Sequence, residues 1–159
     1  MPGEEAPSRA PDPVLVEARF DQYDLRALFS VLRAATTIEA DGDEALRRAG
    51  AGLRLAEFDV LAFIYATESI RPTDLTHRCA MSGNATTVHN IVARLEMRGL
   101  VTRNPHPNDA RGVLVSITDD GREAVNATFP LIERKVINRF AAHFTPDELR
   151  TIADLLERH

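Results

Sequence analysis

The chain has 159 residues, of which 44% are apolar and 27% charged, values that are ordinary for one globular domain with a full hydrophobic core. No apolar run approaches the roughly 20 residues that span a bilayer, and no signal core stands at the N-terminus, so we expect a cytoplasmic protein without a membrane segment. The single cysteine, Cys79, excludes an internal disulfide framework, and the net charge of −5 argues at first against a nucleic-acid partner.

The N-terminal part of the chain is predicted to be a tail followed by a long helix. Residues 1–13 hold four of the nine prolines among small polar residues, which is typical of a disordered tail. From residue 14 to residue 49 apolar residues recur at three- and four-residue spacing, which indicates a helix that Gly50 and Gly52 end. Because glycine is costly inside a helix, the Asp-Gly-Asp sequence at 41–43 could break it earlier.

A helix-turn-helix is predicted in the middle of the chain. One helix covers residues 55–67, and a short helix over residues 72–80 follows it. Residues 81–83 form a turn, and an amphipathic helix then continues to residue 98. A short helix, a tight turn and a second helix make a helix-turn-helix.

The second helix of this helix-turn-helix has signals at both ends. Ser82 or Asn84 is a suitable N-cap, and Gly99 ends the helix. The apolar residues that it points inward are Val88, Ile91, Val92 and Leu95.

A β-hairpin is predicted directly after this helix. Leu100–Arg103 alternates weakly and Val113–Ile117 is β-branched, so both are predicted strands. Asn104–Gly112, which holds two prolines, is predicted to be the loop between them, with Asp109 and Arg111 at an exposed, charged tip. This layout is that of a winged helix, whose helix can enter the DNA major groove while the tip reaches the neighbouring minor groove.

The C-terminal part is predicted to contain two helices. Thr118 caps the first, and Pro130 inside it should kink it nearby. Thr145–Glu148 is a capping box with proline at the first helical position, which begins the final helix. The apolar seam of the longer helix consists of Val125, Phe129, Ile132, Val136 and Phe140.

Charge is distributed unevenly along the chain. The segment Ile70–Gly112 holds six arginines and three acidic residues, so its net charge is +3 and that of the remainder is −8. Three of the five histidines lie in the same segment. An acidic body with a basic patch is compatible with DNA binding, although a merely solvated face would have the same charges.

Four short sequences in this chain share a specific order and spacing. They are LRLAEFDVL at residues 53–61, RLEMRGLVTR at 94–103, DAR at 109–111 and ITDDGR at 117–122. Together with the order of the predicted elements, they resemble the MarR family of bacterial transcription regulators over about residues 20–158.

The resemblance implies a mainly α fold with a small β-hairpin wing and a single domain over residues 14–159. Residues 14–50 and 120–159 would form dimerisation helices that intertwine in a homodimer, and residues 53–118 the winged helix-turn-helix. It implies binding to a short pseudo-palindrome in double-stranded DNA, usually near the regulator's own gene, and relief of binding by a small molecule or an oxidant.

The chain departs from the family pattern at four positions. Arg54 stands where serine or threonine often caps the 55–67 helix, so that cap is lost. His89 and Asn90 stand where small polar and basic residues are common, and Ala110 where a second arginine often occurs. Fewer cations predict a shallower dependence of DNA binding on salt, and weak binding or an unusual site.

We expect the DNA contacts in the recognition helix, its surroundings and the wing. Arg111 at the tip suits a narrow, A·T-rich minor groove, which attracts arginine. Asp109 cannot hold phosphate, and either orients Arg94 or Arg111 through a salt bridge or forms a turn. The predicted set is Thr73, Asn84, Ala85, Thr86, Thr87, His89, Asn90, Arg94, Arg103, Asp109 and Arg111. For each the alternative is a cap or a solvated surface residue.

The remaining candidates concern ligands. Cys79 is predicted to be a buried small hydrophobe rather than a redox sensor. The histidines lack HxxxH and HExxH spacing, and no P-loop, GxGxxG or nucleophile elbow occurs, so we expect no metal, no cofactor and no enzymatic activity. An effector pocket is expected between the dimer helices and the winged helix. Its candidate lining residues, for which ordinary core is the alternative, are Phe20, Tyr23, Phe29, Phe63 and Tyr65.

The predicted function is therefore a dimeric, effector-responsive DNA-binding regulator that acts as a repressor. The alternative is a winged-helix protein–protein module that has lost specific DNA binding, for which the acidic total and the reduced set of basic contacts leave room. An enzyme is disfavoured, because no acid–base or nucleophile constellation stands out.

Overall fold

The chain divides into two compact units, Met1–Thr37 and Ile38–His159. The computed structural model describes residues 23–79 and 84–158, and of residues 23, 24, 110 and 111 the backbone alone. The tail predicted over residues 1–13 and the start of the first predicted helix lie outside the described residues. In the first unit the described part belongs to helix α2, Tyr23–Arg48.

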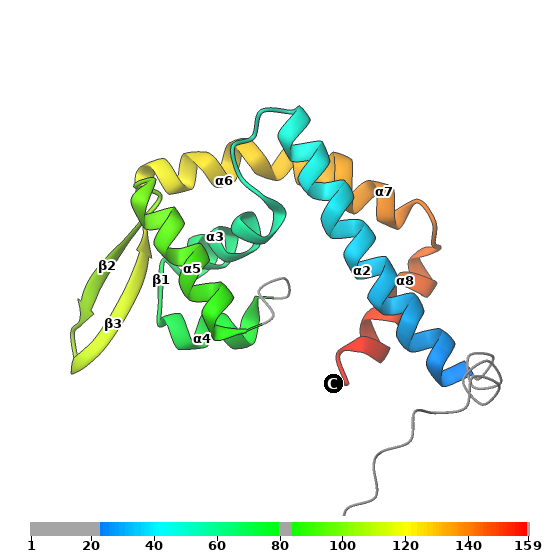
Figure 1. Ribbon diagram of the computed structural model, residues 1–159, viewed down its shortest axis with the longest axis horizontal. Coiled ribbons are helices and arrows are strands. Elements are labelled where there is room, and N and C mark those ends of the chain that lie inside the picture. Colours follow the sequence, from blue (N-terminus) through cyan, green and yellow to red (C-terminus); the bar gives the residue numbers. More distant parts are fainter. Residues whose placement is uncertain (1–22, 80–83, 159) are drawn as a thin grey trace, which may run out of the picture. The chain divides into compact units, whose positions relative to one another are not determined.

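The second unit has the element order of a winged helix, mainly α with a small sheet, as predicted. Its elements are α3 Leu55–Thr67, β1 Ser69–Ile70, α4 Pro72–Arg78, α5 Ala85–Met97, β2 Val101–His106, β3 Asp109–Ile117, α6 Asp119–Ile132, the π-helical segment η1 Glu133–Ile137, α7 Asn138–Ala141 and α8 Pro146–Leu156. Figure 1 shows β2 and β3 projecting from the helices α3, α4 and α5 as a two-stranded ribbon. The turn predicted at residues 81–83 lies in the part that the structure does not describe.

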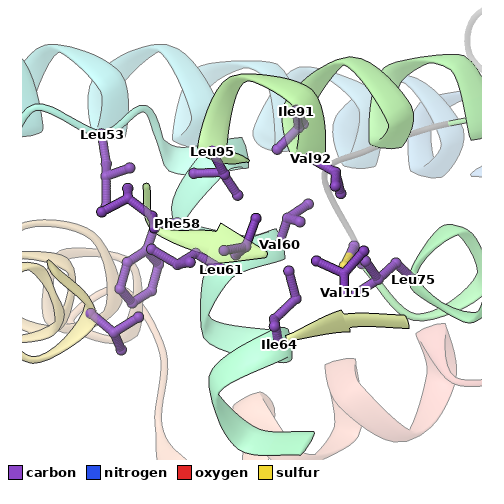
Figure 2. Close-up of a cluster of buried hydrophobic side chains, with 14 of the residues drawn as sticks. Leu53, Phe58, Val60, Leu61, Ile64, Leu75, Ile91, Val92, Leu95 and Val115 are labelled. Carbon is purple, nitrogen blue, oxygen red and sulfur yellow. The ribbon is translucent and has the colours of Figure 1, made fainter. Parts of the chain in front are cut away.

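The core of the second unit is built around α3. This helix is apolar on nearly every side, as its sequence LAEFDVLAFIYAT indicates, and a helix of that kind is stable only when buried. Figure 2 shows its side chains in one cluster with residues of α4, α5 and β3. Burying each large apolar side chain contributes about 1.5–3 kcal/mol. The predicted inward residues of α5, each at most 1% exposed, are confirmed: Val88, Ile91, Val92 and Leu95.

Helix α2 continues through Gly42 to Arg48, contrary to the expectation that the Asp-Gly-Asp sequence could break it. Gly42 is buried, and a Cβ there would lie 2.7 Å from Cδ2 of Leu55 and 3.4 Å from Cγ2 of Val136. The missing side chain lets α2 approach α3 and η1, which offsets the low helix propensity of glycine. Gly50, with a φ of +70°, follows the end of the helix as predicted.

The start of α3 has no cap from the side chain of Arg54, as expected. Two carboxylates take over the free backbone donors instead. Oδ1 of Asp43 accepts the N–H of Leu55 at 2.7 Å, and Oε2 of Glu57 accepts the N–H of Arg54 at 3.2 Å. The cap is therefore supplied in part by α2, which also holds the start of α3 in place.

The hairpin is longer than predicted. Strands β2 and β3 pair as far as His106 and Asp109, and only a two-residue turn lies between them. The prediction of a loop over Asn104–Gly112 is therefore wrong for most of its length. Pro105 fits because β2 is an edge strand in the sheet order β1-β3-β2, where a missing N–H needs no partner. The pairing register shifts between Pro105 and His106, as in a β-bulge, and Gly112 opposite leaves room for His106.

Strand β1 was not predicted, because two residues are too few to show an alternating pattern. Ser69 pairs with Ser116 and Ile70 with Val115. The hydroxyl of Ser116 also donates to the hydroxyl oxygen of Ser69 at 3.1 Å. The base of the hairpin is thereby joined to the segment between α3 and α4.

The C-terminal helices begin where predicted, but the seam is only partly buried. Oγ1 of Thr118 accepts the N–H of Gly121 at 3.0 Å and caps α6, and the capping box at Thr145 begins α8. The backbone changes to the π-helical segment η1 within one turn after Pro130, where an irregularity was expected. Of the predicted seam, Val125 and Ile132 are buried, Val136 and Phe140 half-buried, and Phe129 is 49% exposed.

Substitution Gly121→Ala is expected to destabilise the fold by about 1–3 kcal/mol, although alanine favours a helix. A Cβ at this position, in the first turn of α6, would overlap the backbone carbonyl oxygen of Leu100. Urea unfolding followed by circular dichroism measures the change, with Asn126→Ala on the exposed side of α6 as the control. A Gly121→Ala protein as stable as the wild type would contradict this contact.

Candidate nucleic-acid interface

The N-terminal half of α5 presents small and polar side chains to solvent. Its opposite face is buried in the core, so this face is left free by packing. Hydroxyl, amide and imidazole groups can contact base edges, and methyl groups can contact thymine. The exposed residues are Asn84, Ala85, Thr86, His89 and Asn90, and Thr87 is half-buried.

Asn84 is the N-cap of α5, one of the two predicted possibilities. Its Oδ1 accepts the backbone N–H of Thr87 at 2.9 Å and the hydroxyl of Thr87 at 3.1 Å. Only its amide nitrogen remains free, so Asn84 cannot offer the acceptor and donor together that read adenine. Within the described part of the chain the side chain of Asn90 makes no hydrogen bond, so Asn90 keeps both groups.

The C-terminal end of α5 is held by a buried carboxylate of α3. Glu57 is 6% exposed. Nε of Arg94 donates to Oε1 of Glu57 at 2.9 Å, and Nη1 of Arg98 lies 3.5 Å from Oε2. Arg94 is thus the partner of Glu57, and the expectation that it pairs with Asp109 is wrong.

Arg103 ties the wing to the recognition helix. Its Nε donates to Oε2 of Glu96 at 2.9 Å, which joins β2 to α5. The Arg103 side chain is 27% exposed, and one edge of its guanidinium is occupied by this pair. The predicted DNA contact of Arg103 would therefore use the remaining N–H groups.

The end of the wing is tied to the start of α4. Oδ2 of Asp109 lies 3.5 Å from Nη1 of Arg71, the N-cap residue of α4. Nη2 of Arg71 lies 3.2 Å from Nε2 of His106, whose Nδ1 accepts the N–H of Asn108 at 3.2 Å. Asp109 pairs with an arginine as expected, but Arg71 was not among the predicted partners. The side chain of Arg111 lies outside the described residues.

Thr73 and Arg78, both in α4, are exposed. Thr73 lies in the first turn of α4 with its side chain in solvent. The guanidinium of Arg78, at the end of the helix, lies 6.0 Å from the centroid of the Phe63 ring, which is within the range of a cation–π contact.

Sequence reasoning missed four residues of this ion-paired surface: Glu57, Arg71, Glu96 and Arg98. For Glu57 a signal was present, since a carboxylate between the inward residues Leu55 and Phe58 of an apolar helix requires a cation. The other three give no such signal, because they lie at positions where a solvated charge is equally expected.

The predicted effector residues are not brought together by the described structure. Phe20 and the side chain of Tyr23 lie outside the described residues, and Phe29 belongs to the first unit, where it is 44% exposed. Phe63 and Tyr65 are half-buried two positions apart on α3, so they point to different sides of the helix. Arg78 lies over Phe63, and Arg122 lies 5.9 Å from the Tyr65 ring. The pocket stays a prediction.

Cys79 is buried, 7% exposed, at the C-cap of α4, which confirms the prediction of a small buried residue. Burial raises the pKa of its thiol to about 11, and the Asp59 carboxylate adds to the shift. Over residues 23–79 and 84–158, no three His, Cys, Asp or Glu side chains cluster as metal ligands. None of the helices in these ranges is long and apolar enough to cross a membrane.

Known proteins are similar to this chain in sequence and in fold. The MarR family model matches residues 53–113. The multiple antibiotic resistance protein MarR of Escherichia coli is 32% identical over 103 residues, 65% of this chain and 70% of that protein. The uncharacterised HTH-type transcriptional regulator YdgJ of Bacillus subtilis is 30% identical over 67% of this chain, and the match spans 63% of YdgJ.

Two solved structures are similar to this chain over most of its length. BpsR of Bordetella bronchiseptica, solved in a study of how 6-hydroxynicotinic acid regulates its DNA binding, has a TM-score of 0.73 and 26% identity, covering 87% of this chain and 93% of its own. Sco3205, a MarR family transcriptional regulator from Streptomyces coelicolor solved in complex with DNA, has a TM-score of 0.69 and 25% identity, with coverage of 86% and 85%.

Alkylation of Cys79 by iodoacetamide at pH 8 is expected to be about 100-fold slower in the folded protein than in denaturing urea, because the thiolate is the reactive form. The pKa is raised by folding from 9.0 to about 11, so the thiol's contribution to stability is complete below pH 9 and is lost as the pH rises to 11. Mass spectrometry of timed samples measures the rate. Equal rates in the two states would contradict the buried, protonated thiol.

Proposed function

Because the chain belongs to the MarR family of transcription regulators, we propose that it is a sequence-specific repressor that binds double-stranded DNA near its own or an adjacent gene. The observation that carries the proposal is the exposed polar face of α5 above a buried apolar one, followed in the same unit by a projecting hairpin (Figure 1). In this arrangement α5 enters the major groove and the β2–β3 ribbon reaches the neighbouring minor groove.

The contacts divide into three groups. Thr86, His89 and Asn90 read base edges from the exposed face of α5, with the methyl groups of Ala85 and Thr87 available to thymine. Arg111 enters the minor groove from the wing. Contacts to phosphate come from Thr73, Asn84 and Arg103, whereas Arg94 and Asp109, which are held in ion pairs, support the geometry of the interface.

The regulator acts as a homodimer in the cytoplasm, with dimerisation helices from residues 14–50 and 120–159. Support comes from large apolar side chains that remain exposed on both parts, which is typical of an interface. Two copies related by a twofold axis place two α5 helices on a pseudo-palindromic site. The exposed residues are Leu28, Phe29, Val31 and Leu32 in the first unit, and Phe129, Ile137, Leu155 and Leu156 in the second.

A small organic effector relieves DNA binding in this proposal, as 6-hydroxynicotinic acid regulates the DNA binding of BpsR. It would bind between the dimerisation helices and the winged helix. Phe63 and Tyr65, which are half-buried on different sides of α3, are two of the proposed lining residues. The other proposed lining residues are Phe20, Tyr23 and Phe29.

The proposal is tested by fluorescence anisotropy with DNA from upstream of the protein's own gene, at about 50 and 200 mM salt and with a scrambled competitor. Specific binding that weakens steeply with salt is expected, because phosphate contacts release counterions. Weak binding without sequence preference would overturn it and favour the protein–protein module. The ion-paired arginines of the winged helix support that alternative, because pairing reduces the positive charge that they offer to DNA.

Substitutions His89→Ala, Asn90→Ala and Arg111→Ala are each expected to weaken specific binding by about 1–3 kcal/mol, because each removes a base or groove contact. The same anisotropy assay measures the loss, and Asn126→Ala on α6 is the matched control. Affinities that equal the control's would remove the residue concerned from the interface.

The double substitution Leu155→Asp, Leu156→Asp is expected to convert the dimer to monomers, because it places two charges in an apolar interface. Light scattering after size exclusion reports the mass, and Arg150→Gln on the same helix is the control. A dimer that survives the two aspartates would place the interface elsewhere.

A further inference from the structure

We propose that Glu57 is a positioning residue that sets the sequence specificity of the DNA interface. It fixes the C-terminal end of the recognition helix, and it withholds two guanidinium groups from the DNA backbone. The inference rests on the proposed function, since it concerns how tightly α5 binds specific and non-specific DNA.

Both carboxylate oxygens of Glu57 have partners. Oε1 accepts from Nε of Arg94 at 2.9 Å, and Oε2 accepts the N–H of Arg54 at 3.2 Å and lies 3.5 Å from Nη1 of Arg98. The Glu57 side chain is 8% exposed, so water cannot replace these partners. One carboxylate therefore joins the start of α3, the last turn of α5 and the residue that follows α5.

The ion pairs at the C-terminal end of α5 also determine where its N-terminal turn lies, because the helix is rigid between the two ends. Arg94 lies nine residues after Ala85, which corresponds to about 14 Å along a helix. A small change of angle at Arg94 therefore displaces the first turn, whose side chains must reach base edges within hydrogen-bond distance. Specific binding depends on this placement, whereas binding to phosphates alone does not.

The same contacts reduce the charge that DNA phosphates can use. The side chains of Arg94 and Arg98 are 47% and 40% exposed, so each could turn to a phosphate if it lost its carboxylate. Each phosphate contact adds about 0.9 to the slope of log affinity against log salt, and this term supplies most of non-specific binding.

Carboxylates also pair with two further arginines of this surface, Arg71 and Arg103. Of the five arginines that the structure describes in Ile70–Gly112, four have an acidic partner: Arg71, Arg94, Arg98 and Arg103. Glu57 differs from the other acidic partners in its burial and in holding two arginines at once, so it exerts the largest control over non-specific binding.

Substitution Glu57→Gln tests the proposal, because glutamine keeps the shape and a hydrogen-bond acceptor but removes the charge. Affinity for scrambled DNA is expected to rise about 3–10-fold, and the salt slope to steepen by about one to two. The ratio of specific to scrambled affinity is expected to fall about tenfold. Anisotropy titrations at four salt concentrations give all three quantities, and circular dichroism melts confirm that the variant is folded.

The chain offers a matched control in Glu44→Gln. Glu44 also pairs with two arginines, Arg47 and Arg48, so the substitution makes the same change in net charge, but on α2. Its salt slope is expected to equal that of the wild type. An unchanged slope in Glu57→Gln, an equal loss of affinity for both DNAs, or the same change in Glu44→Gln would overturn the proposal.

Substitution Arg98→Gln tests whether Glu57 keeps the Arg98 guanidinium away from DNA phosphates. Glu57 stays paired with Arg94 in this variant, so no buried charge is left unpaired. The salt slope is expected to stay the same, because Arg98 contacts no phosphate in the wild type. A slope shallower by about 0.9 would overturn the proposal. If the wild-type protein shows no salt-dependent DNA binding, the proposed function itself is overturned. If the wild type binds DNA in a salt-dependent way but Glu57→Gln or Arg98→Gln gives its contrary result, only this inference is overturned.

Discussion

The winged helix depends on the burial of α3. Val60, Leu61 and Ile64 have no exposed surface, and side chains from α4, α5 and β3 pack around them. Because α5 packs on this helix through Val88, Ile91, Val92 and Leu95, its polar face is turned to solvent. The geometry of the DNA-reading surface is thus a consequence of the core, and a change of volume in α3 would be felt in the angle of α5.

Glu57 is the exception in that apolar helix, and its burial explains its pairing. A buried carboxylate without a cation would be strongly destabilising, so two arginines of the neighbouring helix segment are drawn to it. A buried ion pair adds little net stability compared with apolar packing, but it defines one orientation. The hydrophobic core therefore holds α3 and α5 together, and the ion pairs select the orientation in which they meet.

The sequence was sufficient for features whose signals are local. The bounds of α3, the caps at Asn84, Thr118 and Thr145 and the inward face of α5 all follow from residues within one or two helical turns. The wing was less predictable, because proline and glycine indicate a loop locally while pairing with a neighbouring strand decides otherwise. The pairing of Asp109 with Arg71 was missed for the same reason: Arg71 is distant in sequence, and the bulged hairpin brings the two residues together.

The ion pairs of the wing restrict the motion of a hairpin that would be only marginally stable by itself. A two-stranded ribbon is marginally stable in water, and β1 supports only its base. Arg103–Glu96 fixes one strand to α5 and Arg71–Asp109 fixes the far end to α4, so the ribbon loses less freedom when it meets a groove. Both pairs are partly exposed and each is worth at most about 1 kcal/mol, so salt weakens them. Salt should therefore act on this interface twice, once by screening phosphate contacts and once by loosening the element that makes them.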